Sequence, residues 1–178
     1  MREILLFSLL VFLSPAVSAA DAPKSDFNKW LGVYKERFET GTVNSNKKYM
    51  VENILEIVKF DDHSVYFKSK LNFFNGHQCF VYGIADYENG SFIYKASNTR
   101  FSDAEKCVLK INLEQNKISF DDVNGVCRAH SCGSRGGYAG ANFSYNAKRP
   151  IRYMDVILKS SNYKDAVDEF NTRNLGGK

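Results

Sequence analysis

The sequence predicts a mainly β protein: an antiparallel meander of about eight strands, closed as a barrel or folded as a sandwich, with short C-terminal helices packed on it. Three observations lead to this fold class. Apolar residues alternate with polar ones in many short segments up to residue 120, and turn sequences separate these segments. After residue 150 the apolar residues recur at helical spacing instead.

The composition supports one folded domain over residues 21–178. The chain has 178 residues, is 44% hydrophobic and 14% aromatic, and carries a formal net charge of +4. These values exclude a disordered chain and a low-complexity fibre. A protein with several membrane spans is excluded because the sequence has one long apolar run, at its N-terminal end. The length is sufficient for a substantial core.

Residues 1–20 have the pattern of a cleavable secretory signal. Arg2 precedes an apolar stretch at 4–13, and small residues follow at 16–20. The apolar stretch is much shorter than the ~20 residues that a spanning helix needs. We therefore expect a mature chain that starts at Ala20 or Asp21, has no membrane span after cleavage, and is periplasmic or secreted.

The strands can be assigned in order along the mature chain. Residues 27–34 have apolar side chains at helical spacing, which predicts a short helix that can pass into a strand near Gly32. The sequences Asn75-Gly76 and Glu88-Asn89-Gly90 are typical of tight hairpins, because glycine tolerates the positive φ of such turns. The expected strands are 33–38, 53–60, 65–74, 79–87, 91–96, 107–113, 117–120 and 141–145.

The C-terminal helical segment is expected over about 150–172. Pro150 suits a helix start. Two apolar stripes follow at helical spacing, and they predict two short amphipathic helices that pack on the sheet. The stripes consist of Ile151, Met154, Ile157 and Leu158, and of Tyr163, Ala166, Val167 and Phe170.

Four cysteines lie in the expected mature chain, at Cys79, Cys107, Cys127 and Cys132. An even number in an exported protein favours two disulfides, for which three pairings exist. We predict Cys79–Cys107 between strands and Cys127–Cys132 within a glycine-rich loop. The alternative is a metal site at Cys127, His130 and Cys132, but zinc would require a fourth ligand. We expect neither a metal nor another cofactor.

Residues 127–140 are the densest candidate for a binding site. A short disulfide would hold the first half, and four glycines would let the second half adopt left-handed torsions. Arg128, His130, Arg135 and Tyr138 would then be exposed on a rigid loop, where arginine and tyrosine are effective recognition residues. The other reading is a turn in which the glycines serve geometry alone. The loop lacks the pattern of a phosphate-binding loop.

An exported chain of about eight short strands with the sequence Cys132-Gly133-Ser134-Arg135-Gly136-Gly137 resembles small exported bacterial β-barrel proteins of the periplasmic lysozyme-inhibitor type. The resemblance implies a binding protein that inhibits an envelope-acting enzyme by inserting a loop. Common lysozymes are basic, as is this chain, so an acidic envelope or extracellular protein fits better as the partner.

Two further functions stay open on the sequence. One is a lipocalin-like carrier that holds a small apolar ligand among the many aromatic side chains. The other is an envelope hydrolase that uses a serine, a histidine and a carboxylate, although nothing in the sequence brings these together. Nucleic acid is not an expected partner, because the basic residues are dispersed and the net charge is small.

Overall fold

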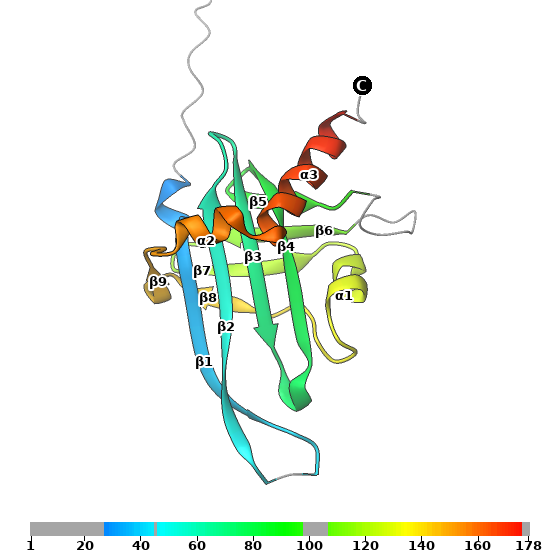
Figure 1. Cartoon of the computed structure of the whole chain (residues 1–178). Helices are drawn as coiled ribbons and strands as arrows, with labels where there is room; N and C mark the ends of the chain where they lie inside the picture. The colour runs from blue at the N-terminus through cyan, green and yellow to red at the C-terminus, as the bar shows by residue number, and fades with distance from the viewer. Residues whose placement is uncertain (1–26, 45, 98–106, 176–178) are drawn as a thin grey trace, which may run out of the picture.

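The computed structural model describes residues 27–44, 46–97 and 107–175, and Figure 1 shows their arrangement. Nine antiparallel strands form one sheet that curls into a nearly closed barrel, with short helices against it. The predicted mainly β fold with C-terminal helices is confirmed. The predicted signal sequence at 1–20 lies outside the described residues.

The sheet is a meander in which each strand from β1 to β8 pairs with its sequence neighbours. Along β6, Leu109 and Ile111 are fully buried while Lys110 between them is partly exposed, as the period of two predicts. The strands are β1 Gly32–Gly41, β2 Lys48–Lys59, β3 Ser64–Asn72, β4 Gln78–Glu88, β5 Ser91–Lys95, β6 Val108–Leu113, β7 Lys117–Asp122, β8 Asn142–Ser144 and β9 Lys148–Arg149. The first eight correspond to the eight predicted strands.

Both predicted Asn-Gly hairpins are confirmed. Asn75 and Gly76 have φ values of 61° and 72°, and Asn89 and Gly90 have values of 47° and 81°. Asn89-Gly90 joins the paired residues Glu88 and Ser91 directly, and positive φ at both central residues is the requirement of such a two-residue type I′ turn. Asn75-Gly76 lies in a longer loop, in which the Phe73 amide donates to the His77 carbonyl at 2.8 Å. The first of these turns lies within the short 3₁₀ helix η2 (Phe74–Gly76). The turns fix the register of β3 with β4 and of β4 with β5.

The barrel closes where the chain crosses from one edge of the sheet to the other. Strand β8 is at one edge and β9 at the opposite edge, and only the 3₁₀ helix η3 (Tyr145–Ala147) separates them. The Tyr145 ring packs edge-on against Trp30 of η1 (Asn28–Trp30), with centroids 5.0 Å apart. The Tyr145 hydroxyl donates a hydrogen bond to the Lys29 carbonyl at 3.2 Å. These contacts tie the two edges together.

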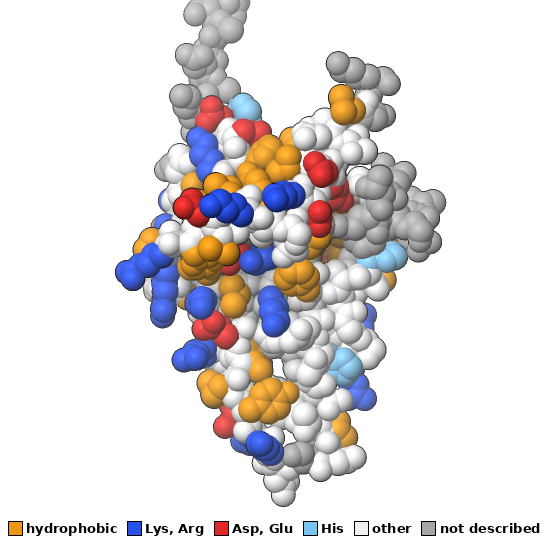
Figure 2. Space-filling view, in the orientation of Figure 1, with side chains coloured by type: hydrophobic (Ala, Val, Ile, Leu, Met, Phe, Trp, Pro, Cys, Tyr) orange, Lys and Arg blue, Asp and Glu red, His pale blue; other side chains and the backbone are white. Residues whose placement is uncertain are grey.

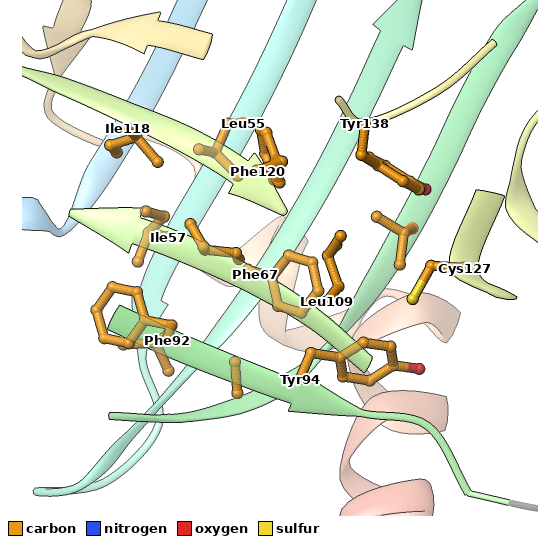
Figure 3. Packing of buried hydrophobic residues seen from close by; sticks show 14 of the residues in the cluster. Leu55, Ile57, Phe67, Phe92, Tyr94, Leu109, Ile118, Phe120, Cys127 and Tyr138 are labelled. Carbon is orange, nitrogen blue, oxygen red and sulfur yellow. The ribbon is translucent and has the colours of Figure 1, made fainter. Parts of the chain in front are cut away.

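Side chains from every strand but the two-residue β9 fill the interior of the barrel, as Figure 3 shows for part of it. The rings of Phe67 and Tyr94 meet edge-on at 5.4 Å, and Phe120 meets Phe143 at 6.2 Å. The largest fully buried interior side chains are Tyr34, Leu55, Ile57, Phe67, Leu71, Phe92, Tyr94, Leu109, Tyr138 and Phe143. These side chains fill the part of the barrel interior that the described residues form.

Strands β4 and β5 are paired next to their connecting turn, from Glu88 and Ser91 to Asp86 and Ile93. We call the seam the part of the barrel wall between the rest of β4 and β5, where no pairs are described. Helix α1 (Val126–Ser131) lies against the β4 side of this seam, where Cys79 and Cys132 form an isolated antiparallel bridge. The buried Glu169 of helix α3 (Ser161–Leu175) accepts hydrogen bonds from the Tyr94 hydroxyl at 3.0 Å and the Ser97 amide at 2.9 Å, next to the end of β5. Helices thus cover the part of the wall that strand pairing leaves open.

The C-terminal helices α2 (Met154–Lys159) and α3 (Ser161–Leu175) lie over the outer face of the sheet in Figure 1. Ile157 and Ala166 pack on Val58, Tyr66 and Ile84 in a second apolar cluster. The apolar stripe predicted for the second helix is confirmed, since Tyr163, Val167 and Phe170 also contact this cluster.

Two details predicted for the first C-terminal helix are wrong. The helix begins at Met154 rather than at Pro150, because pairing of β9 with β1 keeps the chain extended up to Arg149. Met154 and Leu158 are 38% and 41% exposed, so Ile157 is the buried residue of this short helix.

Candidate functional site

The stapled segment, as we call residues 127–140, begins in helix α1 directly after β7. The chain turns at Gly125, whose φ is +73°, and the Asp122 carboxylate accepts hydrogen bonds from the amides of Cys127 at 3.2 Å and Arg128 at 2.8 Å. The Asn124 side chain accepts another from the Val126 amide at 3.2 Å. An acidic side chain on the first amides of a helix satisfies donors that otherwise have no partner there. Asp122 therefore sets where α1 starts.

The two disulfides join Cys79 to Cys132 and Cys107 to Cys127. The involvement of all four cysteines is confirmed, but the predicted pairing is wrong. Cys127 lies inside α1 and Cys132 is its C-cap, so a helical path separates them by ~7.5 Å along the axis, too far for a disulfide without backbone movement. Their side chains instead reach Cys79 in β4 and Cys107 directly before β6, which fastens α1 across the seam. The alternative metal site loses both of its cysteine ligands to these disulfides.

Arg128 folds back on the stapled segment instead of extending from it. Its Nε donates to the Gly136 carbonyl at 2.9 Å, and its Nη2 donates to the Ser134 carbonyl at 3.4 Å. A guanidinium that bridges two carbonyls of one loop fixes the loop's shape, because the planar group presents its donors in a rigid arrangement. Arg128 is thus a structural support, although part of its side chain is exposed.

Tyr138 lies in the barrel interior, so the prediction of an exposed Tyr138 is wrong. The residue is 1% exposed, and its ring centroid lies 6.0 Å from that of Phe120 (Figure 3). Its hydroxyl shares a hydrogen bond with Ser131 Oγ at 2.6 Å, and Ser131 also donates to the Cys127 carbonyl. Burial raises the pKa of Tyr138 to about 12. The tyrosine anchors the far end of the stapled segment in the core.

The glycines of the segment are needed mainly because neighbouring atoms leave no room for a side chain, and less because of left-handed torsions. Of the four glycines at 133, 136, 137 and 140, Gly140 alone has a positive φ, of +81°. A Cβ at Gly136 would lie 2.8 Å from Cys79 Sγ, so this position has room for a hydrogen only. The Gly133 amide donates to the Gln78 carbonyl at 2.8 Å, which binds the segment to the end of β4.

Arg135 and His130 are exposed, and so is Arg128, whose guanidinium binds carbonyls of the segment itself. Arg135 lies between Ser134 and Gly136, whose carbonyls Arg128 holds, and His130 lies on the last turn of α1. A third basic side chain is close by, since a Cβ on Gly133 would lie 3.1 Å from His77 Nδ1. The segment thus presents basic groups on a backbone that two disulfides, a guanidinium and a buried tyrosine hold in place.

Sequence reasoning missed Asp122, Ser131 and His77 as parts of this site. Asp122 could have been found as an acidic residue shortly before a helix, had α1 been recognised. The other two depend on which segments meet in space, and the sequence carries no signal for that. Ser131, beside His130, uses its hydroxyl for Tyr138 and the Cys127 carbonyl, which makes it a poor candidate for a nucleophile.

Neither a cluster of metal-binding side chains nor a membrane-spanning helix is present in the described part of the chain. It holds no group of three or more His, Cys, Asp or Glu side chains arranged to bind a metal ion. Within the same residues, no helix is long and apolar enough to cross a membrane. Comparison with known protein families, curated proteins and solved structures found no match to this chain.

Proposed function

We propose that this chain is an exported, disulfide-stabilised binding protein that recognises an acidic envelope or extracellular protein through its stapled segment. The observation that carries the proposal is a contrast in packing. The barrel interior is filled with aromatic and aliphatic side chains, whereas the stapled segment is held rigidly and exposes Arg135 and His130. Binding at the outer surface suits this arrangement better than carriage of a ligand inside.

Rigidity supports the role of the segment in recognition. A loop that is already ordered loses little conformational entropy when it binds, so more of the contact energy contributes to affinity. Arginine adds a forked donor that pairs with carboxylates, and it is enriched among residues that dominate binding energy. The specific form that we favour is inhibition of an envelope-acting enzyme whose cleft carries carboxylates, the role implied by the resemblance to lysozyme-inhibitor-type proteins.

The test is capture from an envelope extract by the purified protein, followed by identification of the captured protein by mass spectrometry. Arg135→Ala should lower its recovery by about ten-fold and leave the melting temperature unchanged, because the side chain is exposed. Lys164→Ala removes the same charge from exposed helix α3 and should have no effect on capture. Equal recovery with the wild-type protein and Arg135→Ala would contradict the proposal. The inhibitor role requires in addition that the protein slow the reaction of a captured enzyme.

A further inference from the structure

A second candidate binding surface lies on the outer face of the sheet, which is the side of the strands opposite to the barrel interior. Helices α2 and α3 cover one end of this face, and the other end is uncovered (Figures 1 and 2). The strand register places Lys35 beside Ile54, Ile54 beside Lys70, and Lys70 beside Phe80. We call the open face the side chains of Lys35, Glu52, Ile54, Lys68, Lys70 and Phe80.

The open face has an excess of positive charge. Glu52 forms ion pairs with Lys35 at 2.9 Å and with Arg37 at 3.5 Å. At the edge of the open face, the buried Glu56 forms an ion pair with Lys68 at 2.7 Å. Glu56 also accepts a hydrogen bond from the Tyr153 hydroxyl at 2.7 Å. Both carboxylates are therefore balanced by their neighbours. Lys70 is exposed between the apolar side chains of Ile54 and Phe80, so its charge is directed to solvent.

A hollow of about 210 Å³ lies in the open face where the sheet meets the start of α3. Its walls are Ile54, Glu56, Lys68, Lys70, Phe80 and Asn162. Four of these six residues are polar or charged, but the surface that the hollow exposes is mainly apolar, and Phe80 is 42% exposed. Sites for small ligands are mostly apolar and carry a few polar groups that fix the ligand's orientation. A small hollow with one aromatic ring and a few charged or hydrogen-bonding groups suits a sugar, because a sugar ring has an apolar side and carries hydroxyls at its edge.

We propose that the open face binds a linear glycan that carries carboxylates, with one acidic sugar residue in the hollow. The apolar side of the sugar ring would lie on Phe80, and its carboxylate would pair with Lys70. Its hydroxyls would exchange hydrogen bonds with the Asn162 amide and the Glu56 carboxylate. A sugar further along the chain would place its carboxylate near Lys35, two strands and ~10 Å away. This proposal is independent of the stapled segment.

The experiment uses polygalacturonate, a linear chain in which every sugar carries a carboxylate, as the probe. The purified protein should bind it by calorimetry, and the affinity should fall as salt is raised, because exposed charges are screened. Lys70→Gln and Phe80→Leu should each weaken binding by about ten-fold, and Asn162→Ala should weaken it less. Lys164→Gln on α3 and Arg135→Ala in the stapled segment should leave the affinity unchanged. Unaltered melting temperatures would show that the variants are folded.

Three further probes separate this ligand from others with the same charge. Methyl-esterified polygalacturonate lacks the carboxylates and should not bind. Poly-glutamate and vesicles that contain phosphatidylglycerol carry negative charge without sugar rings and should bind at least about ten-fold more weakly. Equal or tighter binding of poly-glutamate or the vesicles would overturn the proposal in favour of an acidic protein or a membrane surface. Undetectable binding of polygalacturonate at low salt, or binding that Lys70→Gln and Phe80→Leu leave intact, would also overturn it.

Discussion

Removal of the Cys79–Cys132 disulfide should destabilise the fold by about 4 kcal/mol. The two cysteines are 53 residues apart, and the shortest covalent loop, which passes through the inner disulfide, holds about 33 residues. The chain-entropy estimate for either loop length is about 4 kcal/mol, because the cost depends on the logarithm of the length. The inner Cys107–Cys127 disulfide spans 20 residues, and its removal should cost about 3 kcal/mol.

The assay is guanidinium unfolding of Cys79→Ala/Cys132→Ala and of Cys107→Ala/Cys127→Ala beside the wild-type protein. The free energy of unfolding should fall in both, and more in the first, because its loop is longer and it joins β4 to the C-terminal end of α1. A loss below about 1 kcal/mol in both variants would contradict the view that the disulfides hold α1 across the seam.

Thiol counting on the first of these variants and on a third, Cys79→Ala/Cys107→Ala, tests the pairing directly. Cys79→Ala/Cys132→Ala keeps a native pair and should contain no free thiol. Cys79→Ala/Cys107→Ala leaves Cys127 and Cys132 on the helical path of α1, where they cannot reach each other, and should contain two. The reverse pattern, two thiols in the first variant and none in the second, would refute the pairing found in the structure.

Two other predictions concern single side chains that hold the stapled segment in place. Asp122→Ala removes the acceptor for the amides of Cys127 and Arg128, and chemical denaturation should show a loss of about 1 kcal/mol or more. Tyr138, whose pKa burial raises to about 12, should remain neutral in the folded protein well above pH 10. The neutral form favours the folded state, so its contribution to stability is complete below pH 10 and is lost as the pH rises from 10 towards 12. Absorbance titration of the wild-type protein and Tyr138→Phe should reveal this late step, and a Tyr138 that ionises near pH 10 would contradict the burial.

The strands were predictable because each is specified by local chemistry. The alternation of Leu109, Lys110 and Ile111 gives one buried and one exposed face, and Asn89-Gly90 can form the turn that its hairpin needs. These signals lie within a few residues of one another. The sequence alone was therefore sufficient for the meander and for the C-terminal helical segment.

Helix α1 and its surroundings were not predictable in the same way. The helix has only six residues, too few to establish an apolar stripe, and it begins after Gly125 with its cap four residues upstream at Asp122. Without the helix, the short spacing of Cys127 and Cys132 suggested a local disulfide. The glycines beside Tyr138 indicated an adaptable backbone, but they carry no information about which way the tyrosine points.

The open face was hidden from sequence reasoning for another reason. Lys35, Ile54, Lys70 and Phe80 come from four strands, and none of them is unusual in its own segment. They become neighbours only through the register of three successive strand pairs, which depends on turn lengths and burial throughout the sheet. A surface of this kind can be recognised only after the strands have been aligned.

Closure of the barrel and presentation of the stapled segment depend on the same contacts. No pairs with β5 are described for β4 before Asp86, so the barrel interior at the seam has to be covered by another element. Helix α1, held by its two disulfides, covers part of it. The side chains of the stapled segment that face inward, such as Tyr138, should therefore affect stability and binding together. Exposed Arg135 should affect binding alone. A loss of binding thus identifies a contact with a partner only where stability is retained, and within the segment Arg135 and His130 are the positions at which that distinction can be made.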